Sequence, residues 1–213
     1  MAGMLDHTLL KPEATEAEIG RMCEETIRYQ FASICILPAW TPYCVGFKAH
    51  GKITVCTVTG FPLGASPTNI KAAEAGQSVM DGADEIDMVI NLGWMKSGHY
   101  DLVERDIRAV VRASVGRLVK VIIETCVLTD EEKIRACLLA KKAGAGFVKT
   151  STGFHPGGGA TAQDVALMRR TVGPDMGVKA SAGIRTPEQA QIMVAAGANR
   201  IGTSSSLKII GVK

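Results

Sequence analysis

The sequence predicts an α/β protein with a single domain, residues 1–213, folded as a (β/α)8 (TIM) barrel. Short runs rich in β-branched residues alternate with longer helical patterns over the whole chain, which is typical of repeated βα units around a parallel sheet. Three of these runs follow the same glycine-alanine formula, in "DGADEI", "AGAGFV" and "AGANRI". A repeated joint between helix and strand explains this formula better than shared turn chemistry alone. No linker, low-complexity segment or change of composition divides the chain.

Eight segments have the composition of strands. They are residues 5–10, 33–37, 53–61, 84–91, 118–125, 146–151, 177–181 and 199–204. Eight such units in 213 residues fit a closed barrel better than an open doubly wound sheet, which the strand count alone leaves as the alternative.

Two of the intervening helices have a readable start. Thr15 is followed three residues later by Glu18, and Thr129 by Glu132. This spacing is the capping box, in which the two side chains satisfy free backbone N–H groups of the first helical turn. We therefore expect helices to begin after Thr15 and after Thr129.

Composition excludes several classes of protein. A hydrophobic content of 46% and a net charge of +3, with basic and acidic residues interleaved, indicate a globular core and disfavour a nucleic-acid surface. The six cysteines form no C-x-x-C pair and are typical of reduced core residues. The N-terminus resembles neither a leader nor a membrane helix, so we expect a soluble, cytoplasmic protein. The four histidines have no metal-ligand spacing, and we expect no metal.

Two lysines stand in strands where a buried apolar residue is the norm. Lys149 in "FVKTSTG" and Lys179 in "GVKASAG" occupy equivalent places in two similar blocks. The active site of such a barrel lies at the carboxyl ends of its strands. Alternation along each strand directs both lysines toward the barrel interior, and the same alternation in "DEIDMVIN" places Asp87 there.

Burying a lysine is costly, so two of them suggest a function. Mutual repulsion and burial are expected to lower the pKa of one lysine, and a neutral amine can form a Schiff base with a carbonyl substrate. A shift from about 10.4 to about 7 requires roughly 4.6 kcal/mol. The structural alternative is that each lysine pairs with a carboxylate such as Asp87 or Glu124. Lys120 lies early in its strand, where a structural ion pair is the better interpretation.

Glycine-rich and hydroxyl-rich turns follow the last strands, in "STGFHPGGGAT", "SAGIRT" and "GTSSSLK". Backbone N–H groups in such turns bind phosphate, and barrels commonly place a phosphate site after their last two strands. The candidates for this site are Gly183, Gly202, Ser204 and Ser205.

Taken together, these blocks resemble the deoxyribose-phosphate aldolase family over essentially the whole chain. The matching segments include "LDHTLLKPEAT", "CTVTGFPLG", "EIDMVINLG", "KVIIETCVLT", "FVKTSTGF", "GVKASAGIRT" and "RIGTSSS". The resemblance implies a class I aldolase without metal or cofactor. Such an enzyme reversibly cleaves 2-deoxy-D-ribose 5-phosphate to D-glyceraldehyde 3-phosphate and acetaldehyde in deoxyribonucleotide catabolism, and acts as a homodimer or homotetramer.

The resemblance also implies residue roles. Lys149 would form the Schiff base, Lys179 would lower the pKa of Lys149, and Asp87 would assist proton transfer through water. Asp6 and Thr8 would line the sugar end of the site. The phosphate end would be lined by Gly153, Gly183, Gly202, Ser204 and Ser205.

The chain departs from the family pattern at three places. Ala182 replaces the first of two glycines after the second lysine, where a methyl group could crowd the phosphate or remove a strained backbone conformation. Leu37 precedes Pro38 where the family usually has asparagine or tyrosine, and this alters the pocket rim. Phe154 stands where some members have lysine, and the chain ends at Lys213 without a tyrosine tail, so phosphate affinity and tail-assisted proton transfer are expected to differ.

Two other functions remain open. One is a Schiff-base aldolase for another phosphorylated sugar or a keto acid, which the pocket rim would decide. The other is a barrel that binds a sugar phosphate without converting it, which the change at Ala182 allows and the joint presence of Lys149, Lys179 and Asp87 disfavours.

Overall fold

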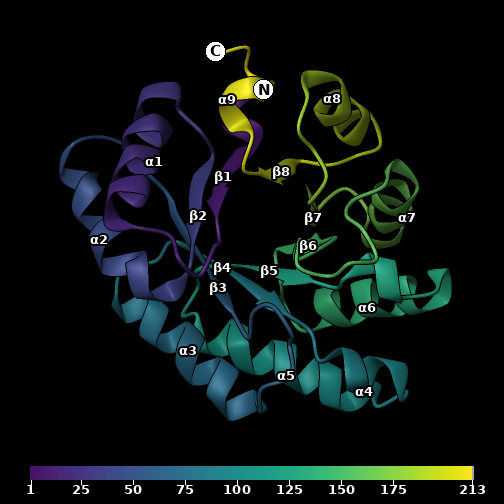
Figure 1. The fold of residues 1–213 in the computed structure, drawn as a ribbon. Coiled ribbons are helices and arrows are strands. Elements are labelled where there is room, and N and C mark those ends of the chain that lie inside the picture. The colour runs from purple at the N-terminus through teal and green to yellow at the C-terminus, as the bar shows by residue number, and fades with distance from the viewer. Residues whose placement is uncertain (213) are drawn as a thin grey trace.

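A computed structural model, which describes residues 1–212, shows a closed barrel of eight parallel strands in the order β1 to β8 (Figure 1). The ring closes between β8 and β1, where Asp6 lies opposite Gly202. The strands are β1 (Leu5–Leu9), β2 (Ser33–Ile36), β3 (Val55–Thr59), β4 (Glu85–Val89), β5 (Leu118–Ile122), β6 (Phe147–Lys149), β7 (Gly177–Ser181) and β8 (Arg200–Thr203). The predicted (β/α)8 barrel is confirmed, and the open sheet is excluded.

Helices surround the barrel (Figure 1). The α-helices are α1 (Glu16–Tyr29), α2 (Thr41–Gly46), α3 (Thr68–Met80), α4 (Leu92–Lys96), α5 (Tyr100–Ala113), α6 (Asp130–Lys142), α7 (Ala162–Val172), α8 (Pro187–Ala195) and α9 (Ser206–Ile209). Short 3-10 helices cover Ala2–Met4, Pro38–Trp40, Phe47–Ala49 and Thr125–Val127. Within residues 1–212, no helix has the length and apolar character needed to cross a membrane.

Both predicted capping boxes are present. The Thr15 side chain accepts a hydrogen bond from the Glu18 backbone N–H, and the Glu18 carboxylate accepts one from the Thr15 backbone N–H. Thr129 and Glu132 do the same at the start of α6. These reciprocal bonds fix where α1 and α6 begin.

Most strands are shorter than predicted, chiefly because their last predicted residues leave the sheet. Residues 53–61 were predicted as one strand, whereas β3 ends at Thr59 and Gly60 adopts a left-handed φ of 62°. Residues 150 and 151 likewise follow the end of β6. These trailing residues build the loops at the carboxyl ends of the strands, where sequence pattern alone does not separate strand from loop.

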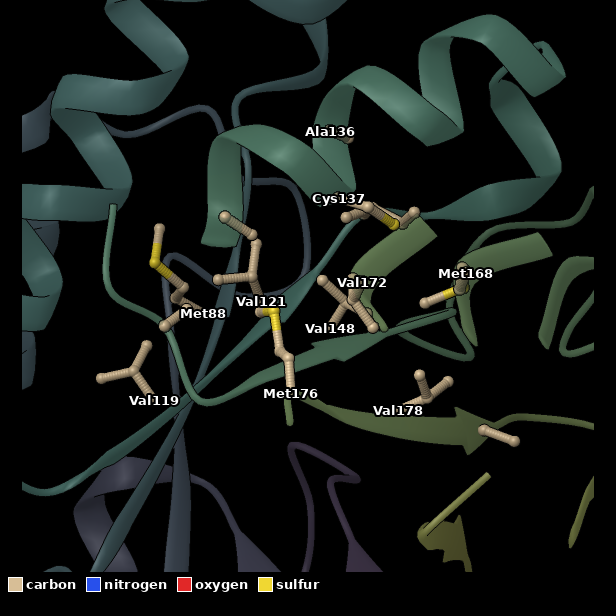
Figure 2. Packing of buried hydrophobic residues seen from close by; sticks show 14 of the residues in the cluster. Met88, Val119, Val121, Ala136, Cys137, Val148, Met168, Val172, Met176 and Val178 are labelled. Carbon is tan, nitrogen blue, oxygen red and sulfur yellow. The ribbon is translucent and has the colours of Figure 1, made fainter. Parts of the chain in front are cut away.

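The main apolar core lies between the barrel and its helices. Figure 2 shows strand residues such as Val121, Val148 and Val178 packed against Cys137 and Val172 of the outer helices. Because side chains alternate along a strand, the neighbours of these residues point into the barrel. The barrel interior holds the charged members of β1 and of β4 to β8, and a smaller cluster of Leu10, Cys35, Cys56 and Val58 lies on the side of β2 and β3.

Candidate active site

Three residues predicted for the site meet in the barrel interior. The Asp87 Oδ2 atom of β4 is 2.8 Å from the Lys149 Nζ of β6 and 2.7 Å from the Lys179 Nζ of β7. Asp87 and Lys179 are fully buried, and Lys149 is 3% exposed. One carboxylate oxygen thus bridges two ammonium groups on neighbouring strands.

A second layer of charges lies below this bridge. Lys120 Nζ is 2.9 Å from Asp87 Oδ1 and 2.6 Å from Glu85 Oε2, which confirms the predicted ion pair at Lys120. Arg200 of β8 contacts both Glu85 and Asp6. Sequence reasoning missed Arg200, although it lies two residues before Gly202 and alternation therefore places both on one face of β8.

Asp6 does not line the sugar end of a pocket, in contrast to its prediction. It is fully buried, its Oδ2 atom lies 2.5 Å from Lys179 Nζ, and its Oδ1 atom accepts from Arg200. The reason is alternation on β1. Asp6 points inward and pairs with Lys179, while Thr8, two residues further along the strand, lines the cavity.

The ion pairs set the protonation of the cluster. Burial alone would raise the pKa of Asp87, but Lys120, Lys149 and Lys179 hold it well below its usual range. Burial alone would lower the pKa of Lys179, but the carboxylates of Asp6 and Asp87 outweigh burial and raise it. Lys179 therefore stays protonated beside Lys149.

The predicted repulsion between the two lysines is thus moderated by a shared carboxylate. Pairing with Asp87, the structural alternative, is present for both lysines. Glu124 pairs with neither of them; it accepts from the backbone N–H and the hydroxyl of Thr152 in the loop after β6. The role of Lys149 as the nucleophile stays a prediction.

A cavity of about 260 Å³ opens above the cluster at the carboxyl ends of the strands. Of the three lysines around Asp87, Lys149 is the one whose side chain lines this cavity. The lining residues are Thr8, Leu9, Leu10, Lys11, Lys149, Thr152, Gly153, Phe154, Ser181, Ala182, Gly183, Ile184, Arg185, Gly202, Thr203 and Ser204. The cavity thus joins a buried amine to glycine and hydroxyl groups.

The phosphate candidates are placed unevenly. Gly153, Gly183, Gly202 and Ser204 line the cavity, and their binding of phosphate stays a prediction. Ser205 does not line the cavity; it lines a neighbouring depression, because the chain turns into α9 immediately after it. The exposed cations Lys11 and Arg185 line the cavity and were missed, since surface lysine and arginine carry no distinguishing sequence signal.

Ala182 keeps the backbone conformation that a glycine would favour there. Its φ is 69°, in the left-handed region, so the predicted loss of a strained conformation is wrong. The Ala160 N–H donates to the carbonyl oxygens of Ser181 and Ala182, both at 3.1 Å. The loop before α7 is therefore hydrogen-bonded to this turn and holds it in place.

Two thiols border the cluster on the side of β2 and β3. Cys56 Sγ is 3.3 Å from Asp87 Oδ1 and accepts from Lys120 Nζ at 3.4 Å. A hydrogen bond from Cys56, opposed by burial and assisted by Lys179, lowers the pKa of Cys35 to about 7. Cys35, Cys56 and Asp87 lie close enough to hold a metal ion. Three ammonium groups surround the same carboxylate, so a cation is disfavoured there.

Comparison with known proteins assigns the family. Residues 1–211 match the family model described as DeoC/LacD family aldolase. Deoxyribose-phosphate aldolase of Streptococcus sanguinis is 59% identical over 206 residues, covering 97% of this chain and 93% of the relative. The Geobacillus sp. enzyme of the same name is 57% identical over 211 residues, covering 99% and 94%.

Solved structures agree with this assignment. A crystal structure described as a putative deoxyribose-phosphate aldolase from Coccidioides immitis has a TM-score of 0.95 and 40% identity, and the match covers 98% of this chain and 83% of that one. The tetrameric deoxyribose phosphate aldolase of Aeropyrum pernix has a TM-score of 0.91 and 35% identity, with 98% and 88% covered. The chain belongs to the DeoC/LacD family of aldolases.

Proposed function

We propose that this chain is a class I aldolase that reversibly cleaves 2-deoxy-D-ribose 5-phosphate to D-glyceraldehyde 3-phosphate and acetaldehyde, in deoxyribonucleotide catabolism. The observation that carries the proposal is the position of Lys149. It contacts the buried Asp87 and also lines the cavity, so its amine can meet a bound carbonyl. Relatives that are 57–59% identical carry the name of this activity.

Lys149 is the proposed nucleophile. Its neutral amine adds to the substrate aldehyde to give a carbinolamine, and loss of water leaves an iminium. The iminium accepts the electron pair of the C2–C3 bond when that bond breaks, the C3 hydroxyl gives up its proton, and C3 leaves as the aldehyde carbon of glyceraldehyde 3-phosphate. The remaining enamine is protonated on carbon, and hydrolysis of the new iminium releases acetaldehyde and regenerates Lys149.

Lys179 and Asp87 are proposed to control proton transfer at Lys149. Lys179, held protonated by Asp6 and Asp87, supplies a fixed positive charge that favours the neutral form of a neighbouring amine. Asp87 contacts both nitrogen atoms through one oxygen and can pass protons through a water molecule. Asp6 acts on this chemistry through Lys179 and is a positioning residue.

The substrate phosphate is proposed to bind near Gly183, Gly202 and Ser204. Backbone N–H groups of such turns suit a dianion, and the exposed side chains of Arg185 and Lys11 add positive charge at the same cavity. The sugar hydroxyl groups would then lie toward Thr8, between the phosphate and Lys149.

Reductive trapping tests the nucleophile. Incubation with 2-deoxyribose 5-phosphate and borohydride should leave a stable adduct on Lys149, located by intact mass and peptide mapping. Lys149→Ala should give no adduct, whereas Lys11→Ala, which removes another lysine of the cavity, should keep it. An adduct on Lys179 would move the role to that residue. A folded protein that binds the sugar phosphate and gives no adduct would support the binding-only alternative.

We also propose a cytoplasmic homo-oligomer, either a dimer or a tetramer. The Aeropyrum pernix relative is a tetramer in its solved structure, and large apolar side chains such as Met80 and Ile192 of this chain are 75% and 52% exposed. All six cysteines are free thiols, which suits a reducing compartment. Light scattering of the purified chain would give its mass in solution, and the mass of a monomer would reject the proposed oligomer.

A further inference from the structure

We infer that Phe154, together with Phe61, forms an apolar lip on the cavity that selects unphosphorylated, apolar aldehydes as acceptors in the synthetic direction. This inference rests on the proposed function. In that direction the acetaldehyde enamine on Lys149 attacks an acceptor aldehyde. A C–C bond forms, the acceptor oxygen takes a proton, and hydrolysis releases a 3-hydroxyaldehyde and the free lysine.

Phe154 combines exposure with a place in the site. It lies five residues after Lys149, lines the same cavity, and is 50% exposed. A half-exposed phenyl ring has apolar surface that no protein group covers. Because it lies at the cavity, a bound ligand is the group best placed to cover that surface.

The Phe154 ring has an aromatic partner from another loop. Phe61, in the loop after β3, contacts Phe154 edge-on, with centroids 5.2 Å apart and planes at 87°. This is the favoured geometry for two aromatic rings. The contact joins loops from β3 and β6, which are separated by two strands on one side of the ring.

Contacts with the rest of the protein hold both phenylalanines in place. The Phe154 backbone N–H donates to Thr152 Oγ1 at 3.1 Å, and Thr152 is in turn held by the buried carboxylate of Glu124. Phe61 packs, together with Leu37, against a buried cluster of Leu10, Cys35, Cys56 and Val58. The lip is therefore a preformed surface.

The lip and the phosphate end of the cavity differ in chemistry. Gly183, Gly202, Ser204 and Arg185 come from the ends of β7 and β8, whereas the lip belongs to β3 and β6. An alkyl chain gains about fourfold in affinity for each methylene that apolar surface covers. A phosphorylated acceptor keeps its dianion hydrated or bound to the polar end, and gains nothing from the rings.

Kinetics of aldol addition test the inference. With acetaldehyde as donor, kcat/KM is measured for propanal, butanal, pentanal and hexanal, and for glyceraldehyde 3-phosphate. In the native chain kcat/KM should rise with alkyl length. Phe154→Ala should flatten this rise and lower the ratio of hexanal to glyceraldehyde 3-phosphate about tenfold. Phe61→Ala should have the same direction of effect, and Phe154→Leu should retain most of the preference.

Leu63→Ala is the matched control. Leu63 belongs to the same loop as Phe61 and is 73% exposed. It lies outside the cavity lining and outside the aromatic pair that Phe61 forms with Phe154, so its removal should leave the ratio unchanged. Thermal unfolding of each variant shows whether the fold is intact.

Two failures are distinguishable. If the native chain neither cleaves 2-deoxyribose 5-phosphate nor forms a borohydride adduct, the proposed function fails and the inference falls with it. If the native chain is active and Phe154→Ala leaves the length dependence as it was, only the lip is rejected.

Discussion

The two oxygen atoms of Asp87 have different partners, and this division fixes how the carboxylate is oriented in the buried cluster. Oδ2 contacts Lys149 and Lys179, toward the cavity, and Oδ1 contacts Lys120 and Cys56, away from it. A carboxylate with one oxygen held from below presents the other in a fixed orientation. The position of the proposed nucleophile thus depends on residues that no substrate touches.

Cys56 is the weakest of these contacts and the simplest to test. Cys56→Ala removes the thiol donor to Oδ1, and a lost hydrogen bond of about 0.5–1.5 kcal/mol corresponds to a decrease of roughly two- to tenfold in kcat/KM. Cys56→Ser keeps a donor and should restore most of the activity. The measurement is kcat/KM for cleavage between pH 6 and 9, with thermal stability as the folding control. Equal rates for both variants and the native chain would show that Asp87 needs no thiol.

Ala182 carries a backbone strain that a glycine would release. Its φ of 69° costs an alanine about 1–2 kcal/mol relative to the right-handed region. Ala182→Gly removes this cost and loses about 0.4–1 kcal/mol through the greater freedom of the unfolded chain. We expect a net gain of between about 0 and 1.6 kcal/mol in the free energy of unfolding, measured with urea.

A matched substitution makes the test specific. Ala198 is buried and its φ is not positive, so Ala198→Gly should destabilise the chain. Destabilisation by Ala182→Gly as well would mean that the alanine methyl group contributes packing that outweighs the strain.

At the scale of elements, alternation was the informative signal. It placed Asp87, Lys149 and Lys179 inside the barrel because a strand sends successive side chains to opposite faces. It could not give the height of each side chain along the barrel axis, because that height depends on strand register. Asp6 and Thr8 share a face of β1, yet Asp6 pairs with Lys179 below the cavity and Thr8 lines it. Ser205 was misplaced for another reason, since the turn into α9 obeys no two-residue period.

A buried ion pair ties α3, α5 and β4 together. Lys71 Nζ of α3 is 2.7 Å from Asp106 Oδ2 of α5 and donates to the Val89 carbonyl at the end of β4 at 2.8 Å. Lys71→Met leaves the Asp106 charge buried without its partner, so we expect a loss of about 3–5 kcal/mol in the free energy of unfolding.

Replacing both partners should cost less than this. In Lys71→Met combined with Asp106→Leu no charge is stranded, and urea denaturation of the two single variants and the double variant measures the coupling. Lys48→Met breaks the more exposed pair with Asp84 and should cost less than about 1 kcal/mol. A double variant as unstable as the sum of the single ones would show that Lys71 and Asp106 act independently.

At the scale of the whole molecule, the barrel separates two kinds of interior. Apolar residues fill the space between strands and helices (Figure 2), and charged residues from β1, β4, β5, β6, β7 and β8 fill the barrel itself. The sequence predicts this separation because it depends on local periods. It does not predict which charges meet, because residues such as Asp6 and Arg200 are 194 positions apart and are joined only when the ring closes.

The charged interior makes stability depend on pH in a defined way. The pKa values of Asp6 and Asp87 are lowered, so their contribution is present above about pH 4 and is lost below it. The pKa values of Lys120 and Lys179 are raised, so theirs is present below about pH 10.4 and is lost as the pH rises further. Neither set titrates between pH 5 and 9.

His7 acts on the acid side of this window, below its ordinary pKa of about 6.5, whereas Cys35 acts near pH 7 and above. Burial lowers the pKa of His7, opposed by the hydrogen bond and charge of Glu25, while Arg21 adds to the lowering. Between its folded pKa and about 6.5 the unfolded chain binds the extra proton, so stability falls as the pH falls below about 6.5, by at most about 1.4 kcal/mol per pH unit. Urea denaturation from pH 5 to 9 should show this slope, and His7→Gln should remove it. His99→Gln, at an exposed histidine, should leave it. His7 links β1 to α1 and α9 through its hydrogen bonds with Glu25 and Ser206. If the slope survives in His7→Gln, another group binds the proton, and this link has no role in acid sensitivity.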